Sequence, residues 1–395
     1  MMNAGKTFLL TCLFFLMTFE VTAQEDTAFI FKPTLKVAGR IHYDFELLKF
    51  GEESTLKNGF RRVRFAMSGN VETRLSYMVD VDFARARLGF RHMYIQYNSG
   101  NWGDFAVGSL PEPTSLNMLT SSHYITFFER AMLTSLQNFR FGAGFHYQHF
   151  GLLEQRLGLQ LAYTFNGLNT EGFYDADLAG GNNFVARISG KPFQNKNDHA
   201  LLHLGINFAS RTNDKAPDYQ LRSRLENFTG EKLVAQFDEG GKVQSRRSYG
   251  VEAAGVMGSL SVQGEYKLSQ ILTDEMVFNV NAYYAFVSYF LTGEHRAYKN
   301  GAFSKVLPRR SIDHGGPGAI ELALRYSVMN TSDAPTTFKE MPISGLTKDL
   351  TFGLNWYLNA NARIMYNFVI ADFGFEAPNP NRKELAHLMR FQIHF

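Results

Sequence analysis

The chain has 395 residues, of which 45% are hydrophobic and 14% aromatic, and its formal net charge is only +3. Such a small charge gives no reason to expect nucleic-acid binding. Beyond the N-terminal leader no run of 18 or more apolar residues occurs, which excludes a helical membrane protein. Abundant aromatic residues without long apolar runs are instead typical of strands that alternate apolar and polar side chains.

The N-terminus reads as a targeting segment. Lys6 supplies the positive region, residues 8–19 form a short apolar stretch, and Ala23 ends an acceptable cleavage site. We therefore predict a signal peptide over residues 1–23 and a periplasmic lead-in over 24–34. Cys12 follows a faint lipoprotein-like pattern, but four more apolar residues come after it. Without Cys12 the mature chain has no cysteine, so it has neither a disulfide nor a thiolate metal site.

From residue 35 onward the chain alternates apolar and polar residues in segment after segment. Successive side chains of a strand point to opposite faces, so each segment has one apolar and one polar face. Turn residues such as Gly69-Asn70 and Gly258 separate many of them. The predicted strands are 35–46, 60–68, 74–83, 88–97, 103–109, 140–150, 156–166, 182–190, 200–210, near 247–257, near 259–269, 276–291, 318–329, 348–358, 361–370 and 386–395.

These segments number about sixteen, an even count that places both termini at one end of a closed barrel. The residues predicted to face inward are polar, mainly Arg, Asn, Gln, Asp and Thr. Such residues are expected in a barrel that is wide enough for an aqueous channel. Long polar loops are expected at 47–59 and 211–243. The stretch 292–316 does not fit, because parity places it at the periplasmic end although it is about 25 residues long. Either it folds into the barrel mouth or the count is off by one hairpin.

Two segments carry the strongest signals. Residues 110–139 interrupt the alternation and contain the run LTSSHYITFFER, which is too apolar for a loop in solvent and too long to be without function. The last ten residues, AHLMRFQIHF, alternate strictly and end on Phe395. In water such a strand would aggregate, whereas it is stable when one face meets lipid and its edge pairs with the first strand. The alternative is an edge strand of a soluble sandwich.

Several motifs together resemble the phosphate-selective porin O and P family of bacterial outer-membrane channels. They are GFRRVRFAMSG from Gly59, VGSLPEPTSLNMLTSSHYITFFER from Val107, YFLTGEHRAY from Tyr289, AIELALRYS from Ala319 and GLNWYLNANARIMYNF from Gly353. The resemblance covers nearly the whole mature chain. It implies an all-β transmembrane antiparallel barrel of about sixteen strands over 35–395, a homotrimer in outer-membrane lipid, and an inward-folded third extracellular loop, here 110–139, that narrows the pore. A terminal aromatic such as Phe395 also resembles the signal read by the barrel-assembly machinery.

The resemblance and the strand parity together select candidate pore residues. Arg40, Arg62 and Arg64 match the strand arginines of phosphate-preferring members, and Arg222 and Arg224 resemble the ladder of a later loop. Arginine suits an anion path because its planar fork meets phosphate oxygens bidentately and stays charged. Arg61 points outward by parity and is expected at the rim. In the third loop, Glu129 and Arg130 are interpreted as a structural pair that pins the loop.

Two features depart from the family pattern. Arg130 is the only cation of the third loop, and inward acids are frequent: Asp44, Asp80, Asp82, Glu252, Glu265, Glu321 and Asp349. Lumen arginines that pair with these acids would only rigidify the wall. The predicted function is passive diffusion of small anions such as phosphate, with a general diffusion porin as the alternative. An outer-membrane hydrolase is a weaker alternative, because the histidines are scattered and no catalytic, metal or cofactor motif is recognised.

Overall fold

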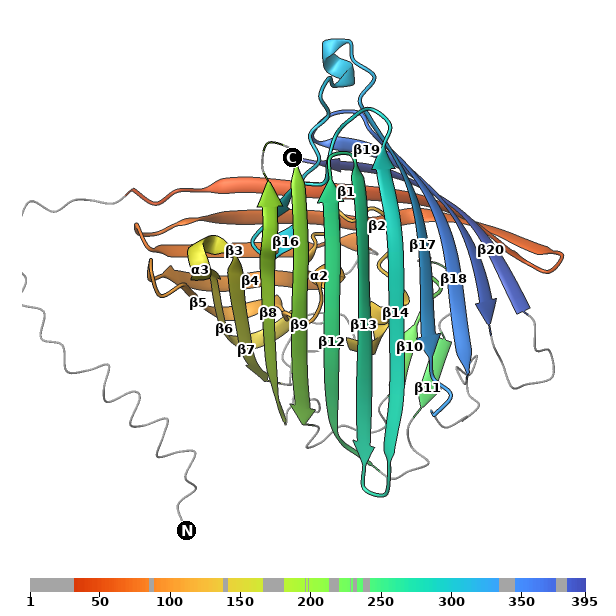
Figure 1. Cartoon of the computed structure of the whole chain (residues 1–395), viewed down its shortest axis with the longest axis horizontal. Helices are drawn as coiled ribbons and strands as arrows, with labels where there is room; N and C mark the ends of the chain where they lie inside the picture. The colour runs from red at the N-terminus through yellow and green to blue at the C-terminus, as the bar shows by residue number, and fades with distance from the viewer. Residues whose placement is uncertain are drawn as a thin grey trace, which may run out of the picture. The chain divides into compact units, whose positions relative to one another are not determined.

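The structure is a computed structural model that describes residues 32–84, 89–137, 141–165, 181–195, 197, 199–212, 220–227, 229, 233–236, 242–333, 345–373 and 382–395. Sixteen antiparallel strands form one closed barrel, which confirms the predicted fold class (Figure 1). The signal peptide and almost all of the lead-in lie outside the described residues. In chain order the barrel strands are β1 (Lys36–Phe50), β2 (Glu53–Asn70), β3 (Leu75–Asp82), β4 (Gly89–Asn98), β5 (Asp104–Pro111), β6 (Phe141–Gly151), β7 (Leu157–Phe165), β8 (Asn182–Asn195), β9 (Ala200–Thr212), β12 (Val243–Met257), β13 (Leu260–Thr273), β14 (Val277–Phe290), β17 (Ala319–Asn330), β18 (Leu346–Tyr357), β19 (Ala362–Phe373) and β20 (Arg382–His394).

The barrel closes between its first and last strands. Residues 40–50 of β1 pair with residues 384–394 of β20, and Phe395 and Gly39 exchange two backbone hydrogen bonds of 2.9 and 3.1 Å. Residues 384–393 of the terminal strand therefore have a paired strand on each side, as a strand inside a bilayer requires. The apolar side chains of β20, such as Met389, Phe391 and Ile393, are exposed on the outer face. The interpretation of the last ten residues as a paired barrel strand is confirmed.

Some predicted boundaries are wrong because strands continue beyond the membrane-facing alternation. Residues 47–59 are not a polar loop: β1 and β2 extend through them and turn at Gly51, whose φ is +61°. The long loop 211–243 contains a separate two-stranded sheet of β10 (Gln220–Ser223) and β11 (Leu233–Gln236). Polar composition alone does not distinguish a solvent loop from strands that pair with one another above the membrane.

The irregular stretch 292–316 leaves the strand count at sixteen. It carries the two-residue strands β15 (Tyr298–Lys299) and β16 (Ala302–Phe303) and the short 3-10 helix η4 (Ile312–His314). Phe303 packs with Leu116 of the predicted third loop and with Leu201 and Val256 of the wall. Of the two explanations left open by the sequence, folding into the barrel mouth is therefore the correct one.

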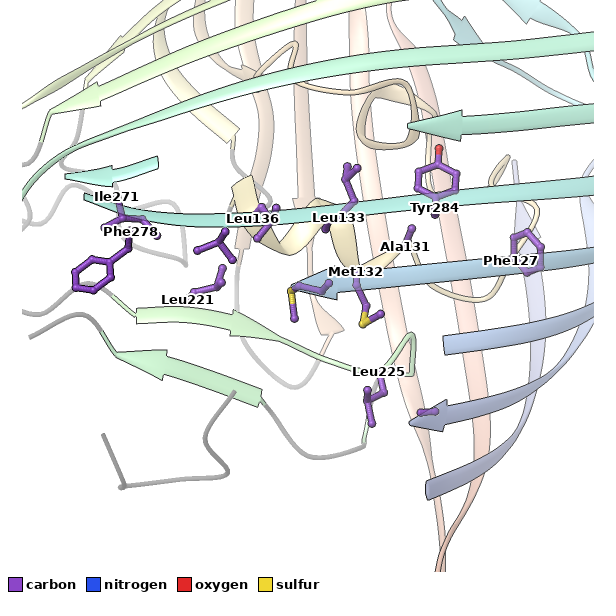
Figure 2. Packing of buried hydrophobic residues seen from close by; sticks show 14 of the residues in the cluster. Phe127, Ala131, Met132, Leu133, Leu136, Leu221, Leu225, Ile271, Phe278 and Tyr284 are labelled. Carbon is purple, nitrogen blue, oxygen red and sulfur yellow. The ribbon is translucent and has the colours of Figure 1, made fainter. Parts of the chain in front are cut away.

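One inward face is apolar, contrary to the expectation of a polar lumen. Along β14 the inward side chains are Phe278, Val280, Ala282, Tyr284 and Phe286, all buried. They are covered by the segment between β5 and β6, which contains α2 (Leu116–Leu119) and η2 (Met132–Gln137). Figure 2 shows Phe127, Ala131, Met132, Leu133 and Leu136 of this segment among side chains of the wall and of residues 221–225. An inward strand face is thus apolar where another segment packs on it rather than water.

None of the helices in the described part of the chain is long and apolar enough to cross a membrane.

Candidate functional site

A cavity of about 420 Å³ inside the barrel is lined by seven arginines. Two carboxylates, Glu129 and Glu226, are in the same lining, together with hydroxyl groups such as those of Ser121 and Ser122. The arginines come from β1, β2, β4, the segment between β5 and β6, and the residues just after β10: Arg40, Arg61, Arg62, Arg64, Arg91, Arg130 and Arg224. The structure therefore brings together Arg40, Arg62, Arg64, Arg224, Glu129 and Arg130 of the predicted set.

Arg61 faces the lumen, so its predicted outward orientation is wrong. The register between β1 and β2 shifts after His42, which pairs with Arg62, because Tyr43 pairs with Phe60. Arg61 is thus the extra residue of a β-bulge, a feature that re-aims a side chain. Its Nε lies 2.7 Å from Oε1 of Glu129. Simple alternation along the strand predicts the wrong side for Arg61, because the inserted residue changes the face of the sheet to which its side chain points.

A second bulge adds Arg91, which the sequence did not single out. Val79 of β3 pairs with Met93 of β4, whereas Val81 pairs with Phe90, so β4 contains one extra residue between these pairs. Arg91 and His92 consequently reach neighbouring acids on β3. Nη2 of Arg91 lies 3.5 Å from Asp82, and Nδ1 of His92 lies 3.0 Å from Asp80. Both bulges thus deliver an additional arginine to the same cavity.

Arg40 differs from the other strand arginines in its partners. Its Nη1 donates to Ser122 Oγ at 3.1 Å and to Ser121 Oγ at 3.4 Å. Among the described residues no carboxylate lies within ion-pair distance of Arg40, whereas Arg64 Nε lies 3.0 Å from Asp82 and Arg62 Nη2 lies 3.6 Å from Glu129. Of the three predicted strand arginines, Arg40 is therefore the one whose charge is least compensated.

Glu129 holds the segment between β5 and β6 to the wall, whereas Arg130 joins two parts of that segment to each other. Glu129 forms ion pairs with Arg61, with Arg62, and with Arg390 of β20 at 3.1 Å. Burial disfavours its charge, but these three guanidinium groups hold the pKa of Glu129 well below its usual range. Arg130 donates to the carbonyls of Asn117, Met118 and Thr120. Burial lowers the pKa of Arg130 to about 10, so it stays cationic at neutral pH.

The later arginines are only partly placed at the cavity. Arg224 lines it and is half-buried near Arg61, Glu129 and Glu46. The backbone of Arg222 lies in β10 opposite Val234. The position of the Arg222 side chain lies outside what the structure describes. Of the two arginines predicted to form a ladder, the structure therefore places Arg224 at the arginine cavity.

Other inward arginines follow the structural alternative, in which cations pair with acids of the wall. Arg325 pairs with Glu226 and donates to the carbonyl of Glu129 at 3.0 Å. Arg363 donates to the carbonyl of Ile125 at 3.0 Å, and Arg390 to that of Phe128 at 2.6 Å while pairing with Asp44. Each of these side chains is buried and holds the segment between β5 and β6, so they anchor it rather than face a passage.

The buried acids of β12 and β13 hold the start of the same segment. Glu252 accepts from the backbone N–H of Leu116 at 2.7 Å, and Glu265 accepts from that of Asn117 at 2.7 Å. Glu252 is also paired with Arg187 of β8 at 2.6 Å. Buried charges need such partners, because an unpaired carboxylate in this setting is costly. Across the described residues, no cluster of three or more His, Cys, Asp or Glu is arranged to hold a metal ion.

The barrel with an apolar outer face, a basic internal cavity and segments packed inside it defines a porin of the Gram-negative outer membrane, a channel rather than an enzyme. The family model of phosphate-selective porin O and P matches residues 35–395, and the chain belongs to this family.

The chain is similar to two curated proteins, one of which is a porin. Porin O of Pseudomonas aeruginosa is 26% identical over 376 residues, covering 86% of this chain and 83% of that protein. An uncharacterized protein of Caulobacter vibrioides is 27% identical over 280 residues, which cover 69% of this chain. The match spans 55% of the Caulobacter protein, about half its length.

Solved structures share the fold at low sequence identity. OprB of Pseudomonas putida superposes with a TM-score of 0.60 and 7% identity, over 91% of this chain and 94% of that chain. The anion-selective porin of Comamonas acidovorans gives a TM-score of 0.56 and 12% identity, over 92% of this chain and all of that chain. The trimer form of OmpT of Vibrio cholerae gives 0.54 and 11% identity, over 92% of this chain and all of that one. These likenesses support the barrel architecture.

Proposed function

We propose that this porin favours small anions such as phosphate and that the arginine cavity is the selective part of its passage. The observation that carries the proposal is the cavity lining itself, in which seven guanidinium groups face two carboxylates. Rings of cationic side chains select anions electrostatically, and arginine holds phosphate oxygens with two parallel hydrogen bonds. The Comamonas porin, which shares the fold, is anion-selective, in line with this proposal.

The segment 110–139 acts as the constriction loop in this proposal. Its described part, residues 110–137, is pinned to the wall by Arg363, Arg390 and the acids of β12 and β13, and Arg130 braces it internally. Its apolar residues cover the inward face of β14. Because that half of the lumen is packed, the open space lies on the side of β1, β2 and β4, where the arginines are. A solute then passes within reach of Arg40, Arg62 and Arg64.

Orientation and assembly follow from the same barrel. Both barrel termini lie at one end, which we assign to the periplasm, consistent with removal of residues 1–23 during export. We further propose a homotrimer. β3 and β5 have eight residues each, whereas a tilted strand needs about 9–11 to span the bilayer. On their side of the barrel, Ile95, Phe105 and Val107 each expose half or more of their possible area. Contact with neighbouring subunits would cover this apolar part of the wall, where the strands are short.

Reversal potentials in planar bilayers test the anion preference. With a tenfold KCl gradient across the membrane, the reversal potential of the purified channel should have the same sign as the equilibrium potential of chloride. Millimolar phosphate should reduce the chloride current. A potential near zero with no effect of phosphate would instead identify a general diffusion porin. The observation that favours this second candidate is that Asp80, Asp82 and Glu129 already compensate Arg61, Arg62, Arg64 and Arg91.

Phe395 is expected to be read during insertion by the barrel-assembly machinery. Its backbone pairs with Gly39, and its ring lies so close to Gly39 that a Cβ there would be 2.4 Å from Cζ. Deleting Phe395 should lower the amount of protein in the outer membrane several-fold and increase its degradation in the periplasm. Fractionation with immunoblotting measures both. The conservative variant Phe395→Tyr should insert normally, and unchanged surface levels after the deletion would contradict this prediction.

A further inference from the structure

The outer wall has an apolar hollow of about 890 Å³ across β7, β8, β9, β12 and β13. It exists because outward positions on β8, β12 and β13 carry small residues: Gly190, Ala253 and Gly264. Leu204 of β9 pairs with Gly190 on one side and with Ala253 on the other, and Ala253 pairs with Gly264. Larger outward residues, including Ile188, Ile206 and Tyr266, form its rim. The volume lies in the range of pockets that hold small ligands, about 300–1,000 Å³.

A second hollow of about 580 Å³ continues the first toward β14. The two share Ala253 and Gly264, and the second adds Gly255 of β12 and Ala285 of β14. Ala285 pairs with Gly264, so the small residues continue in register across the strands. The wall is therefore indented over a continuous stretch, whereas elsewhere on these strands residues such as Tyr249, Tyr283 and Tyr289 project outward.

The first hollow adjoins a polar cleft at the barrel end. A cleft of about 290 Å³ is lined by Arg156, Lys191, Ser189 and Asn300, and it shares Arg156, Leu157 and Gly190 with the apolar hollow. Arg156 and Lys191 also lie together in a further depression with Glu154, which leaves one net positive charge there. An apolar space that opens into a cationic one matches an amphipathic ligand with an anionic end.

The backbone fixes the position of Arg156 in two ways. It follows α3 (Leu152–Gln155), in which Leu153, Glu154 and Gln155 have φ values of +48°, +57° and +63°. Three consecutive residues with positive φ, none of them glycine, are rare and persist only where their surroundings require them. The carbonyl of Arg156 also accepts from the N–H of Lys191 at 2.7 Å, which keeps the two cations adjacent. The turn thus presents a preformed pair of charges at the edge of the wall.

This edge lies at the end of the barrel that carries both termini. Successive barrel strands alternate in direction, so the end of β6, the sixth, and the end of β8, the eighth, lie on the same side as the end of β20, the sixteenth. With that end in the periplasm, Arg156 and Lys191 stand at the headgroup level of the inner leaflet, which is made of glycerophospholipid. The hollows then lie at acyl-chain depth in the same leaflet.

We propose that this site binds one anionic glycerophospholipid, with its phosphate at Arg156 and Lys191 and an acyl chain in the hollow of Gly190, Ala253 and Gly264. Cations near a membrane surface attract anionic lipid, and the shaped hollow gives the chain a defined place on the wall. Free phosphate would need only the cations and leaves the apolar hollow unexplained. A second copy of the chain would need the hollow but not the cations.

Native mass spectrometry of the detergent-solubilised protein tests the site, with dipalmitoyl phosphatidylglycerol as the probe. Arg156→Gln removes one cation, and Ala253→Leu fills the hollow without placing a first Cβ on a glycine. Arg74→Gln is the matched control for charge, since Arg74 is exposed in a turn at the same end. Val277→Leu is the control for bulk, because Val277 is exposed on β14 away from both hollows.

The wild-type chain and both controls should retain one phosphatidylglycerol. Arg156→Gln should bind about fivefold more weakly, as expected for about 1 kcal/mol per cation near anionic lipid, and Ala253→Leu should lose retention. Equal retention by Ala253→Leu would overturn the proposal, as would displacement of the lipid by inorganic phosphate alone or a change of oligomer mass in that variant. If Ala253→Leu fails to insert, Gly190→Leu provides the same test, because Gly190 lines the first hollow and a Cβ there would meet nothing nearer than 3.4 Å. None of these readouts depends on ion selectivity.

Discussion

Replacing Arg40, Arg62 and Arg64 together by alanine should lower the anion-to-cation permeability ratio about tenfold, which corresponds to about 1.4 kcal/mol. Opposite charges 4 Å apart at a protein surface attract by about 4 kcal/mol, and partial compensation by Asp82 and Glu129 reduces the net value. The field in the cavity therefore weakens strongly but does not vanish. Reversal potentials in a KCl gradient measure the ratio. Block of the chloride current by phosphate should weaken in parallel.

The three single variants should rank in a defined order. Arg40→Ala should have the largest effect, since Arg40 contacts Ser121 and Ser122 rather than an acid. Arg62→Ala and Arg64→Ala should have smaller effects, because their guanidinium groups are held by Glu129 and Asp82 and are less available to a passing anion. Equal reversal potentials for Arg40→Ala and the wild type would contradict this ranking.

Arg74→Ala is the appropriate control, because Arg74 lies in an exposed turn outside the cavity. Arg325 and Arg363 are buried anchors of the segment between β5 and β6, so alanine at either position tests folding as well as selectivity. If the triple variant is folded and trimeric and keeps its reversal potential, the inward acids rather than these arginines set the field. The porin assignment would remain, and the anion preference would not.

Glu129→Gln should destabilise the constriction loop and, where the channel assembles, increase its anion preference. Removing one partner of a buried ion pair typically costs about 3–5 kcal/mol, and Glu129 is shared by Arg61, Arg62 and Arg390. Loss of this carboxylate also removes the negative charge that offsets Arg61 and Arg62, so the field of these arginines acts more strongly on a passing anion. The midpoint temperature at which the folded barrel loses its faster gel mobility measures stability, and reversal potentials measure selectivity.

The pH dependence of the same variant provides an independent check. The pKa of Glu129 is depressed in the folded state, so its stabilisation is present above its unfolded pKa of about 4.3 and is lost as the pH falls through the lower folded value. The wild type should therefore lose stability in strong acid through this group, and Glu129→Gln should lack that part of the acid loss. Thr134→Ser, at another cavity position on η2, is the control for a change of side chain on the same loop.

Strand alternation predicted the barrel correctly because one face of each strand meets lipid and tolerates only apolar side chains. It failed at Arg61 and Arg91, where bulges add a residue. Both bulges follow the same local pattern, Gly-Phe-Arg and then a second cationic or imidazole residue, at Gly59 and at Gly89. Two consecutive polar residues inside an alternating strand were the available signal. They could have identified the bulges, and with them the two additional arginines of the cavity.

Other parts of the site could not be read from the sequence because they depend on contacts between distant segments. Glu129 and Arg390 are 261 residues apart, and Asp44 and Arg390 are 346 apart. The apolar inward face of β14 was also not distinguishable from a lipid-facing one, since both consist of the same residue types. Only the packing of Phe127 and Leu133 on that face shows that it points into the lumen and that the opposite face meets lipid.

The two bulges also affect how quickly an ion can leave. In a regular strand, inward side chains recur about every 6.8 Å, twice the rise per residue, whereas a bulge places two successive side chains in the lumen within about half that distance. Arg61 and Arg62 therefore compress positive charge into a short axial interval, and Arg91 adds a further cation to the same cavity. An electrostatic well that is deep but short binds one anion at a time and needs only a small displacement for escape. Attraction and high turnover are thereby compatible in a single narrow section.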